Sequence, residues 1–230
     1  MRPVTRGPDP GPFAQYRDAA EPLMDRLGCY CSYCERYIET HLAVEHMQPK
    51  DLNPALERTW SNFLLACVNC NSCKGDTPIN LVGYLWPDID NTIRAFKYRS
   101  GLVELAPTLD VLTRQLAESL YMLVGLDKDP GNPSPQRKPT SADRRWKTRE
   151  DIWGVAQQSL DDLRQPGADT PQMRNQIART AAARGGFGIW FTVFEADADM
   201  LSRLVFAFPG STPECFGAMG EPLQRPGGRL

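Results

Sequence analysis

The stretch Cys31-Ser-Tyr-Cys34, followed by Val44-Glu45-His46 and by Cys67-Val-Asn-Cys70, contains the strongest pattern in the sequence. In each Cys-x-x-Cys pair both sulfurs can reach one ion from a tight turn. Two such pairs separated by a few tens of residues are typical of a structural zinc site. A simple zinc ribbon does not need a histidine preceded by a carboxylate between its cysteine pairs. The stretch therefore indicates a metal site with additional chemistry beside it.

Six of the seven cysteines lie between Cys29 and Cys73. Since the chain has no apolar export segment, this clustering favours metal binding over disulfides. Cys29 and Cys73 are extra thiols, and Cys73 is an alternative ligand because it has the same spacing from Cys70 that Cys70 has from Cys67. We expect Cys29 and Cys73 to be small buried or half-exposed residues. The expected zinc ligands are Cys31, Cys34, Cys67 and Cys70.

The composition is that of a folded protein, with 230 residues, 41% hydrophobic content and a net charge of −2. The sequence contains no apolar run long enough to span a membrane, and we expect a cytoplasmic protein. Residues 1–80 contain eight Lys and Arg against ten Asp and Glu. Any affinity for nucleic acid must therefore come from a local basic patch, from a bound metal ion or from a partner protein.

In the first third of the chain, residues 1–12 predict an extended arm, although a disordered tail fits the same composition. A helix is expected over residues 14–27, ending at Gly28. Alternating residues at 42–46 predict a strand. The apolar residues at 60–66 predict the start of a helix with Ser61 as its N-cap.

The remaining residues predict mainly helices. The segments 93–98 and 102–105 resemble a β-hairpin that turns at Ser100-Gly101. Helical periodicity is expected over 108–124, 143–163 and 172–184, and the apolar segment 188–208 has helical spacing and is expected to be buried. We expect the last twenty residues to be loose. The six Lys and Arg between 137 and 149 favour a solvated helix face or, alternatively, a contact with phosphates or an acidic partner.

The residues around the cysteine pairs resemble the HNH endonuclease family, whose core is a ββα-metal fold. The resemblance covers about a fifth of the chain. At the third position of the motif, where the family name implies a histidine, this chain has Asn71. The pattern is filled by Cys31, Cys34, Val44, Glu45, His46, Pro49, Asn62, Leu65, Cys67, Cys70, Asn71 and Lys74. The resemblance implies an α+β chain with a small ββα-metal core, a structural four-cysteine zinc site and a mainly helical C-terminal half. We expect a division into residues 1–80 and 81–230.

The resemblance implies hydrolysis of DNA phosphodiester bonds. An imidazole is suited to deprotonating a water molecule near neutral pH, and His46 is the expected general base. Glu45 and Asn71 are the expected ligands of a catalytic divalent ion, usually Mg²⁺. Asn62 is expected to fix the loop that holds His46, and Lys50 and Lys74 are candidates for contacts with phosphate.

The wider context is similar to the HNH subunit of Septu-type anti-phage systems, the PtuB family, whose partner is an ABC-type ATPase called PtuA. This resemblance implies a nuclease effector under the control of an ATPase. Two alternatives remain open from the sequence. One is a zinc-ribbon module that binds nucleic acid or protein without cutting, and the other is an HNH nuclease that acts on RNA.

Overall fold

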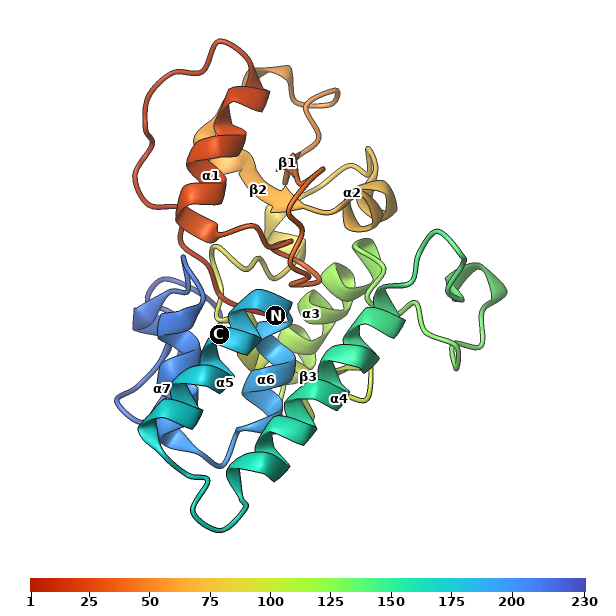
Figure 1. The fold of residues 1–230 in the computed structure, drawn as a ribbon. Helices are drawn as coiled ribbons and strands as arrows, with labels where there is room; N and C mark the ends of the chain where they lie inside the picture. The colour runs from red at the N-terminus through yellow and green to blue at the C-terminus, as the bar shows by residue number, and fades with distance from the viewer.

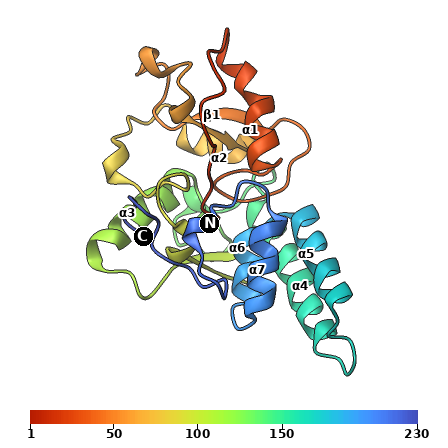
Figure 2. The ribbon, with the colours of Figure 1, turned by 90° about the vertical axis from the view of Figure 1, so that its left-hand side faces the viewer.

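The computed structural model describes residues 1–230. It contains helices and two small sheets, which confirms the predicted α+β class. The α-helices are α1 (Ala20–Leu27), α2 (Val68–Lys74), α3 (Val111–Leu123), α4 (Arg145–Leu163), α5 (Pro171–Arg184), α6 (Phe187–Val193) and α7 (Ala198–Ala207). The strands are β1 (Ala43–His46), β2 (Phe63–Ala66), β3 (Phe96–Arg99) and β4 (Leu102–Leu105). In two perpendicular views, α1, β1, β2 and α2 lie at one end of the molecule and α4 to α7 at the other (Figure 1 and Figure 2).

Strands β1 and β2 form an antiparallel pair in which Val44 lies opposite Leu65 and His46 lies opposite Phe63. The strand predicted at 42–46 is confirmed, whereas the helix predicted from Trp60 is wrong. Residues 60–62 form a single 3₁₀ turn, and all four residues of β2 are buried. Because these apolar residues are buried on both faces of a strand, they form a continuous run that resembles a helix segment in the sequence.

Helix α2 follows β2 directly, and its N-cap is Cys67 rather than the expected Ser61. The Cys67 sulfur accepts a hydrogen bond from the backbone N–H of Cys70 at 3.4 Å. The cysteine pair thus forms the first turn of the helix. On the other side of the pair of strands, α1 packs on β2 and ends at Gly28, as predicted. Pro22 does not break α1, because it lies in the first turn, where no intrahelical N–H is needed.

The predicted hairpin is confirmed as β3 and β4. Ser100 and Gly101 both have positive φ, at 44° and 86°, as a two-residue turn of this hand requires. Helices α3, α4 and α5 are also confirmed. Thr170 caps α5 by accepting a hydrogen bond from the N–H of Met173 at 3.2 Å.

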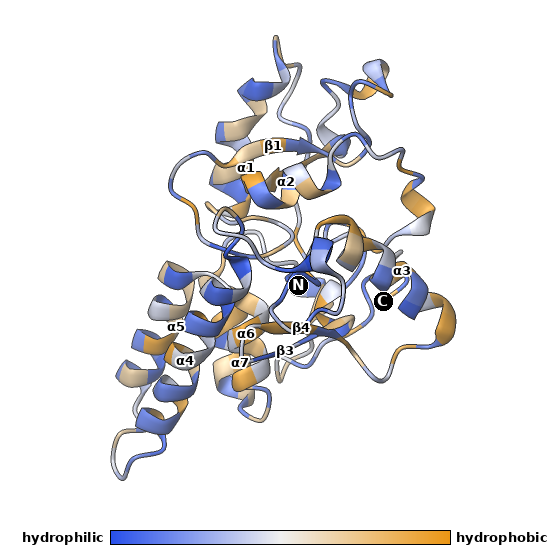
Figure 3. Cartoon of the chain, turned by 90° about the vertical axis from the view of Figure 1, so that its right-hand side faces the viewer, coloured by the Kyte–Doolittle hydropathy of each residue, from blue (hydrophilic) through white to orange (hydrophobic).

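The apolar segment 188–208 forms two helices, α6 and α7, rather than one. The break lies at residues 194–197, where the Asp197 carboxylate accepts a hydrogen bond from the N–H of Met200 and begins α7. Helix α6 packs on β3 and α4, and it is more hydrophobic than α4 and α5 (Figure 3). The break coincides with the acidic residues Glu195, Asp197 and Asp199, which interrupt the apolar segment.

The N-terminal arm is extended and ordered. Val4 pairs with Ser211, so the arm lies beside the segment that follows α7. The last residues are irregular but packed, which corrects the expectation that they are loose. The buried Asn91 side chain donates hydrogen bonds to the carbonyls of Cys215 and Leu223 at 2.7 and 2.6 Å.

One hydrophobic core of 46 buried residues includes side chains from both predicted parts of the chain, among them Phe63 and Trp190. The division at residue 80 stays a prediction. None of the helices combines the length and the apolar character that crossing a membrane requires.

Candidate metal centre and adjoining polar pocket

The four predicted zinc ligands come together. The sulfurs of Cys31, Cys34, Cys67 and Cys70 all lie within 4.8 Å of one another, and all four residues are buried. The first two cysteines belong to the loop before β1, and the last two to the start of α2. Cys29 and Cys73 lie outside this group and are half-buried. The pairing of Cys67 with Cys70, rather than of Cys70 with Cys73, is therefore the one that builds the cluster.

The donor set fits a tetrahedral zinc ion. Burial raises the pKa of the Cys31 and Cys70 thiols, so thiolates at these positions need a nearby cation. Two arginines, Arg36 and Arg145, interact electrostatically with sulfurs of the cluster. The sulfurs of Cys34 and Cys67 raise the pKa of the Arg36 guanidinium even though burial lowers it. Four cysteines would fill the coordination sphere of zinc, so a zinc ion here has a structural role.

His46 lies at the end of β1 with its ring fixed on three sides. Its Nε2 is 2.9 Å from the backbone carbonyl oxygen of Glu57. The rings of Tyr16 and Phe63 meet it edge to face, with centroid distances of 5.0 and 5.1 Å. Since a carbonyl can only accept a hydrogen bond, Nε2 carries the hydrogen and Nδ1 carries the lone pair. The loop thereby selects the tautomer that can accept a proton at Nδ1.

Asn62 holds both ends of the loop that carries Glu57. Its Oδ1 accepts a hydrogen bond from the N–H of Gln48 at 2.8 Å, and its Nδ2 donates to the carbonyl of Gln48 at 2.9 Å. A longer bond of 3.4 Å joins Nδ2 to the carbonyl of Leu56. Gln48 lies two residues after β1 and Leu56 directly precedes Glu57. The buried Asn62 side chain therefore ties the start of the loop to the segment whose carbonyl binds His46.

Glu45 and His46 lie on opposite faces of β1. The Glu45 carboxylate is buried, accepts a hydrogen bond from the Tyr33 hydroxyl at 2.6 Å and is paired with the Lys74 ammonium at 2.8 Å. Lys74 is also buried, and it donates to the carbonyl of His46 at 2.7 Å. In this structure, therefore, Lys74 braces β1 and Glu45 lies away from the pocket that His46 lines.

His46 and Asn71 line the same small polar pocket, of about 170 Å³, together with Lys50, Lys74 and Asp76. The side chain of Asn71 makes no hydrogen bond within the chain, so its amide oxygen is available to a ligand. The Lys50 ammonium lies at the rim, paired with the exposed Asp51 at 2.8 Å. Of the predicted residues, the pocket thus brings together His46, Asn71, Lys50 and Lys74.

A second polar pocket of about 500 Å³ adjoins the first through Tyr16 and Lys50, which line both. Arg17 and Arg58 are exposed, line this second pocket and form no ion pair with any carboxylate of the chain. The motif pattern did not identify them, because one precedes the pattern and the other lies in its variable loop. Arg58 directly follows Glu57, whose carbonyl orients His46.

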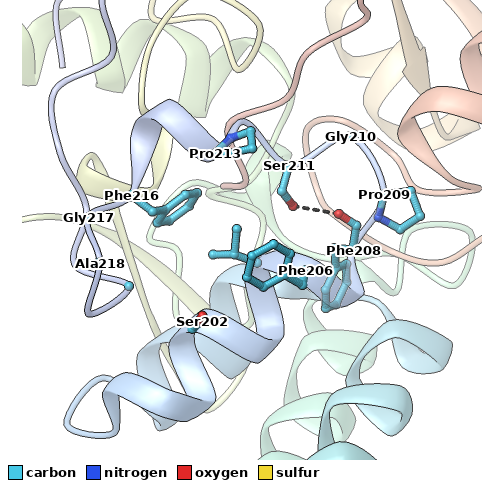
Figure 4. Close-up of a pocket in the computed structure, with 12 residues that line it drawn as sticks. Ser202, Phe206, Phe208, Pro209, Gly210, Ser211, Pro213, Phe216, Gly217 and Ala218 are labelled. Carbon is cyan, nitrogen blue, oxygen red and sulfur yellow. Dashed lines mark hydrogen bonds between the residues drawn. The ribbon is translucent and has the colours of Figure 1, made fainter.

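The chain also has an apolar pocket of about 500 Å³ between α7 and the segment after it. Phe206 and Phe216 line it, and it shares no residue with the two polar pockets (Figure 4). None of its lining residues is titratable. It therefore offers no group for acid–base chemistry.

Comparison with known proteins supports the resemblance at the metal centre. No curated protein matches the chain. Residues 31–77 match the family model described as HNH endonuclease, and this region contains the four-cysteine cluster, His46, Asn62 and Asn71. Residues 31–77 are therefore similar to the HNH endonuclease family.

Proposed function

We propose that the protein is a nuclease that hydrolyses DNA phosphodiester bonds, with His46 as general base. The observation that carries the proposal is the hydrogen bond from Nε2 of His46 to the Glu57 carbonyl, at 2.9 Å, in a pocket shared with Asn71. A histidine whose only role was packing would not need one ring nitrogen left free at the edge of a polar pocket. The free Nδ1 of His46 takes a proton from the attacking water.

The rest of the site orients this base. Asn62 holds the loop that supplies the Glu57 carbonyl, and Lys74 holds the backbone of His46 through its carbonyl oxygen. Both act through His46 and are positioning residues. Since both are buried, their bonds are protected from competition with water, and the imidazole keeps one orientation.

A catalytic divalent ion fits Asn71 but does not fit Glu45 as the structure stands. The Asn71 side chain is unbonded and lines the pocket, whereas the Glu45 carboxylate is already paired with the Lys74 ammonium. A divalent ion would supply charge neutralisation at the phosphate and the leaving oxygen. Glu45 stays a predicted ligand, and binding through it requires Lys74 to move away.

Three basic residues, Arg17, Lys50 and Arg58, form a basic rim that favours binding of a polyanionic substrate. Lys50, Arg17 and Arg58 surround the second polar pocket, and only Glu57 among its lining residues is acidic. In a chain of net charge −2, this is a local basic patch of the kind that DNA affinity requires. We infer that the sugar-phosphate backbone of the DNA, on one side of the cleaved bond, runs from the His46 pocket across Tyr16 to Arg17 and Arg58.

The biological setting is part of the proposal and is supported by the resemblance of the motif context to Septu-type systems. In that setting the protein is the nuclease effector of an anti-phage complex, and an ABC-type ATPase is its partner. Co-expression of the full chain with such an ATPase, followed by size-exclusion chromatography, tests this part. Separate elution of the two proteins at micromolar concentration would argue against it.

The catalytic proposal is tested by comparing wild type with His46→Ala and Asn71→Ala in a cleavage assay that includes the ATPase. Removal of a general base typically lowers the rate by about 10²- to 10⁴-fold. We expect that loss for His46→Ala at every Mg²⁺ concentration, and a loss for Asn71→Ala that raised Mg²⁺ partly restores. Wild-type cleavage by His46→Ala would refute the mechanism. Parallel assays on DNA and RNA separate the two substrates, and binding without cleavage by wild type would favour a non-catalytic module.

A further inference from the structure

An arginine of the C-terminal half reaches the sulfur cluster. Arg145, the first residue of α4, is only 2% exposed. Its Nη1 donates to the sulfur of Cys70 at 3.0 Å, and its Nη2 lies 3.5 Å from the sulfur of Cys73. The basic stretch in which it lies was expected to form a solvated face or a phosphate contact. Neither expectation describes this residue.

Every other donor of Arg145 is also engaged. Its guanidinium is paired with Asp143, with bonds of 2.7 Å from Nε and from Nη2. Nη1 donates to the carbonyl of Val124 at 2.6 Å, and Nη2 to the carbonyl of Gly125 at 3.0 Å. One side chain therefore joins the start of α4, the residues that end α3 and the second cysteine pair.

Gly125 is needed for this approach. It has a φ of 67°, and a Cβ at this position would lie 2.8 Å from the sulfur of Cys73 and 2.9 Å from Nη2 of Arg145. The backbone after α3 thus lies close to both groups, and a larger residue would displace them. The junction is closely packed as well as charged.

The charge of the junction depends on the metal. Four thiolates and one zinc ion carry two negative charges together, and buried charge of this kind must be compensated. Arg145 donates to the sulfur of Cys70 at 3.0 Å, so one guanidinium group lies directly against the centre. Release of zinc removes two positive charges from the cluster, so the charge that Arg145 meets at Cys70 differs between the metal-loaded and the metal-free protein.

We propose that Arg145 binds the metal-loaded thiolate centre through Cys70 and thereby attaches the C-terminal half of the chain to the HNH domain in a metal-dependent way. The bond has two consequences. It stabilises the net negative charge of the zinc-loaded centre, which slows release of the zinc. It also makes the contact between α4 and α2 respond to the state of the metal. The proposal does not depend on nuclease activity.

The test is the rate at which zinc-loaded protein releases zinc to a chelating dye, 4-(2-pyridylazo)resorcinol, at neutral pH. Arg145→Lys keeps the buried charge, but one ammonium cannot replace the several directed bonds of the guanidinium. We expect about tenfold faster release, the effect of losing one hydrogen bond to a charged group. Arg145→Gln removes the charge as well and should release zinc faster still.

Arg149→Lys is the matched control. Arg149 lies one turn further along α4, is equally buried and donates to the carbonyl of Gly101 at 2.7 Å, but bonds to no sulfur. Its substitution weakens the docking of α4 without touching Cys70. Faster release from Arg145→Lys together with the wild-type rate for Arg149→Lys supports the proposal, and equal rates for the two variants overturn it. If Arg145→Gln does not fold, the comparison of the two lysine variants still decides.

Discussion

The ammonium of Lys74 in α2 lies 2.8 Å from Oε1 of Glu45 in β1, and both side chains are almost completely buried. This ion pair joins the strand that carries His46 to the helix that carries Asn71. Because a buried charge without its partner is costly, the pair makes the geometry of the site sensitive to either residue.

Lys74→Met should therefore be strongly destabilising. It leaves the Glu45 carboxylate buried without a cation, and we expect a loss of about 3–5 kcal/mol in the free energy of unfolding. The double variant Glu45→Gln/Lys74→Met removes both charges and keeps an acceptor for the Tyr33 hydroxyl, so it should recover a large part of this loss. Urea denaturation measures the free energy of unfolding of the single and the double variant. Lys97→Met, which breaks the exposed pair with Glu195, should cost less than about 1 kcal/mol, and a similar cost for Lys74→Met would contradict the prediction.

Substitution of Asn62 should affect both stability and activity. Asn62→Ala removes the bonds to Gln48 and Leu56 and leaves buried backbone groups unpaired, at about 1–3 kcal/mol. The loop that bears Glu57 is then less constrained, so kcat should fall while substrate binding changes little. Asn53→Ala is the control, since Asn53 lies in the same loop but donates only to the carbonyl of Pro49 at 3.1 Å. Equal kcat values for the two variants would show that the loop does not act through Asn62.

The choice of zinc ligands predicts different outcomes for neighbouring cysteines. Cys67→Ser should lose the metal and lower the thermal unfolding temperature strongly, because formation of the site and folding are coupled. Cys73→Ser should keep about one zinc ion per chain, since Cys73 lies outside the cluster. Elemental analysis and thermal denaturation check both variants. A metal-free Cys73→Ser would place the ligand set elsewhere.

The basic rim predicts a change in the salt dependence of DNA binding. Arg17→Ala and Arg58→Ala each remove one unpaired cation, so the slope of log K against log salt should fall by about one for each substitution. The measurement is best made with His46→Ala as background, because the DNA then stays intact. Arg99→Ala, on the exposed hairpin and paired with Glu104 at 2.9 Å, is the control. An unchanged slope for all three would exclude the proposed path and leave the role of His46 untouched.

The buried Tyr30 and the half-buried Tyr121 predict a loss of stability in alkali. Burial raises the pKa of Tyr30 and Tyr121 to about 12, above the value near 10 of an unfolded chain. The folded state thus favours the neutral phenol, so the associated stability is complete below pH 10 and is lost as the pH rises towards 12. Urea midpoints between pH 8 and 11 should fall with pH. They should fall less steeply for Tyr30→Phe than for Tyr37→Phe, whose ring is exposed.

Much of the local structure could be predicted from the sequence because its causes are local. Two Cys-x-x-Cys pairs indicate one metal site since their spacing alone limits where the sulfurs can reach. The turn at Ser100-Gly101 and the helix end at Gly28 were predicted correctly, as their backbone angles and hydrogen bonds involve residues a few positions apart. The similarity of residues 31–77 to the HNH endonuclease family likewise follows from the motif.

Other features depend on contacts between distant parts of the chain. Residues 63–66 are a short apolar run that is compatible with either a buried helix or a buried strand. Only their pairing with β1 makes them a strand. Glu45 and His46 are neighbours in sequence, yet strand geometry directs them to opposite faces, and Lys74 binds the one that was expected to bind a metal ion.

The clearest difference concerns charge. The sequence by itself determined that six cations lie between residues 137 and 149, and a charged side chain is by default solvated. Only the tertiary structure decided that Arg145 is buried, because its guanidinium bonds the sulfur of Cys70, 75 positions earlier in the chain, in addition to the neighbouring Asp143 carboxylate. The fate of a charge depends on its partner in space, and spacing along the chain does not determine that partner.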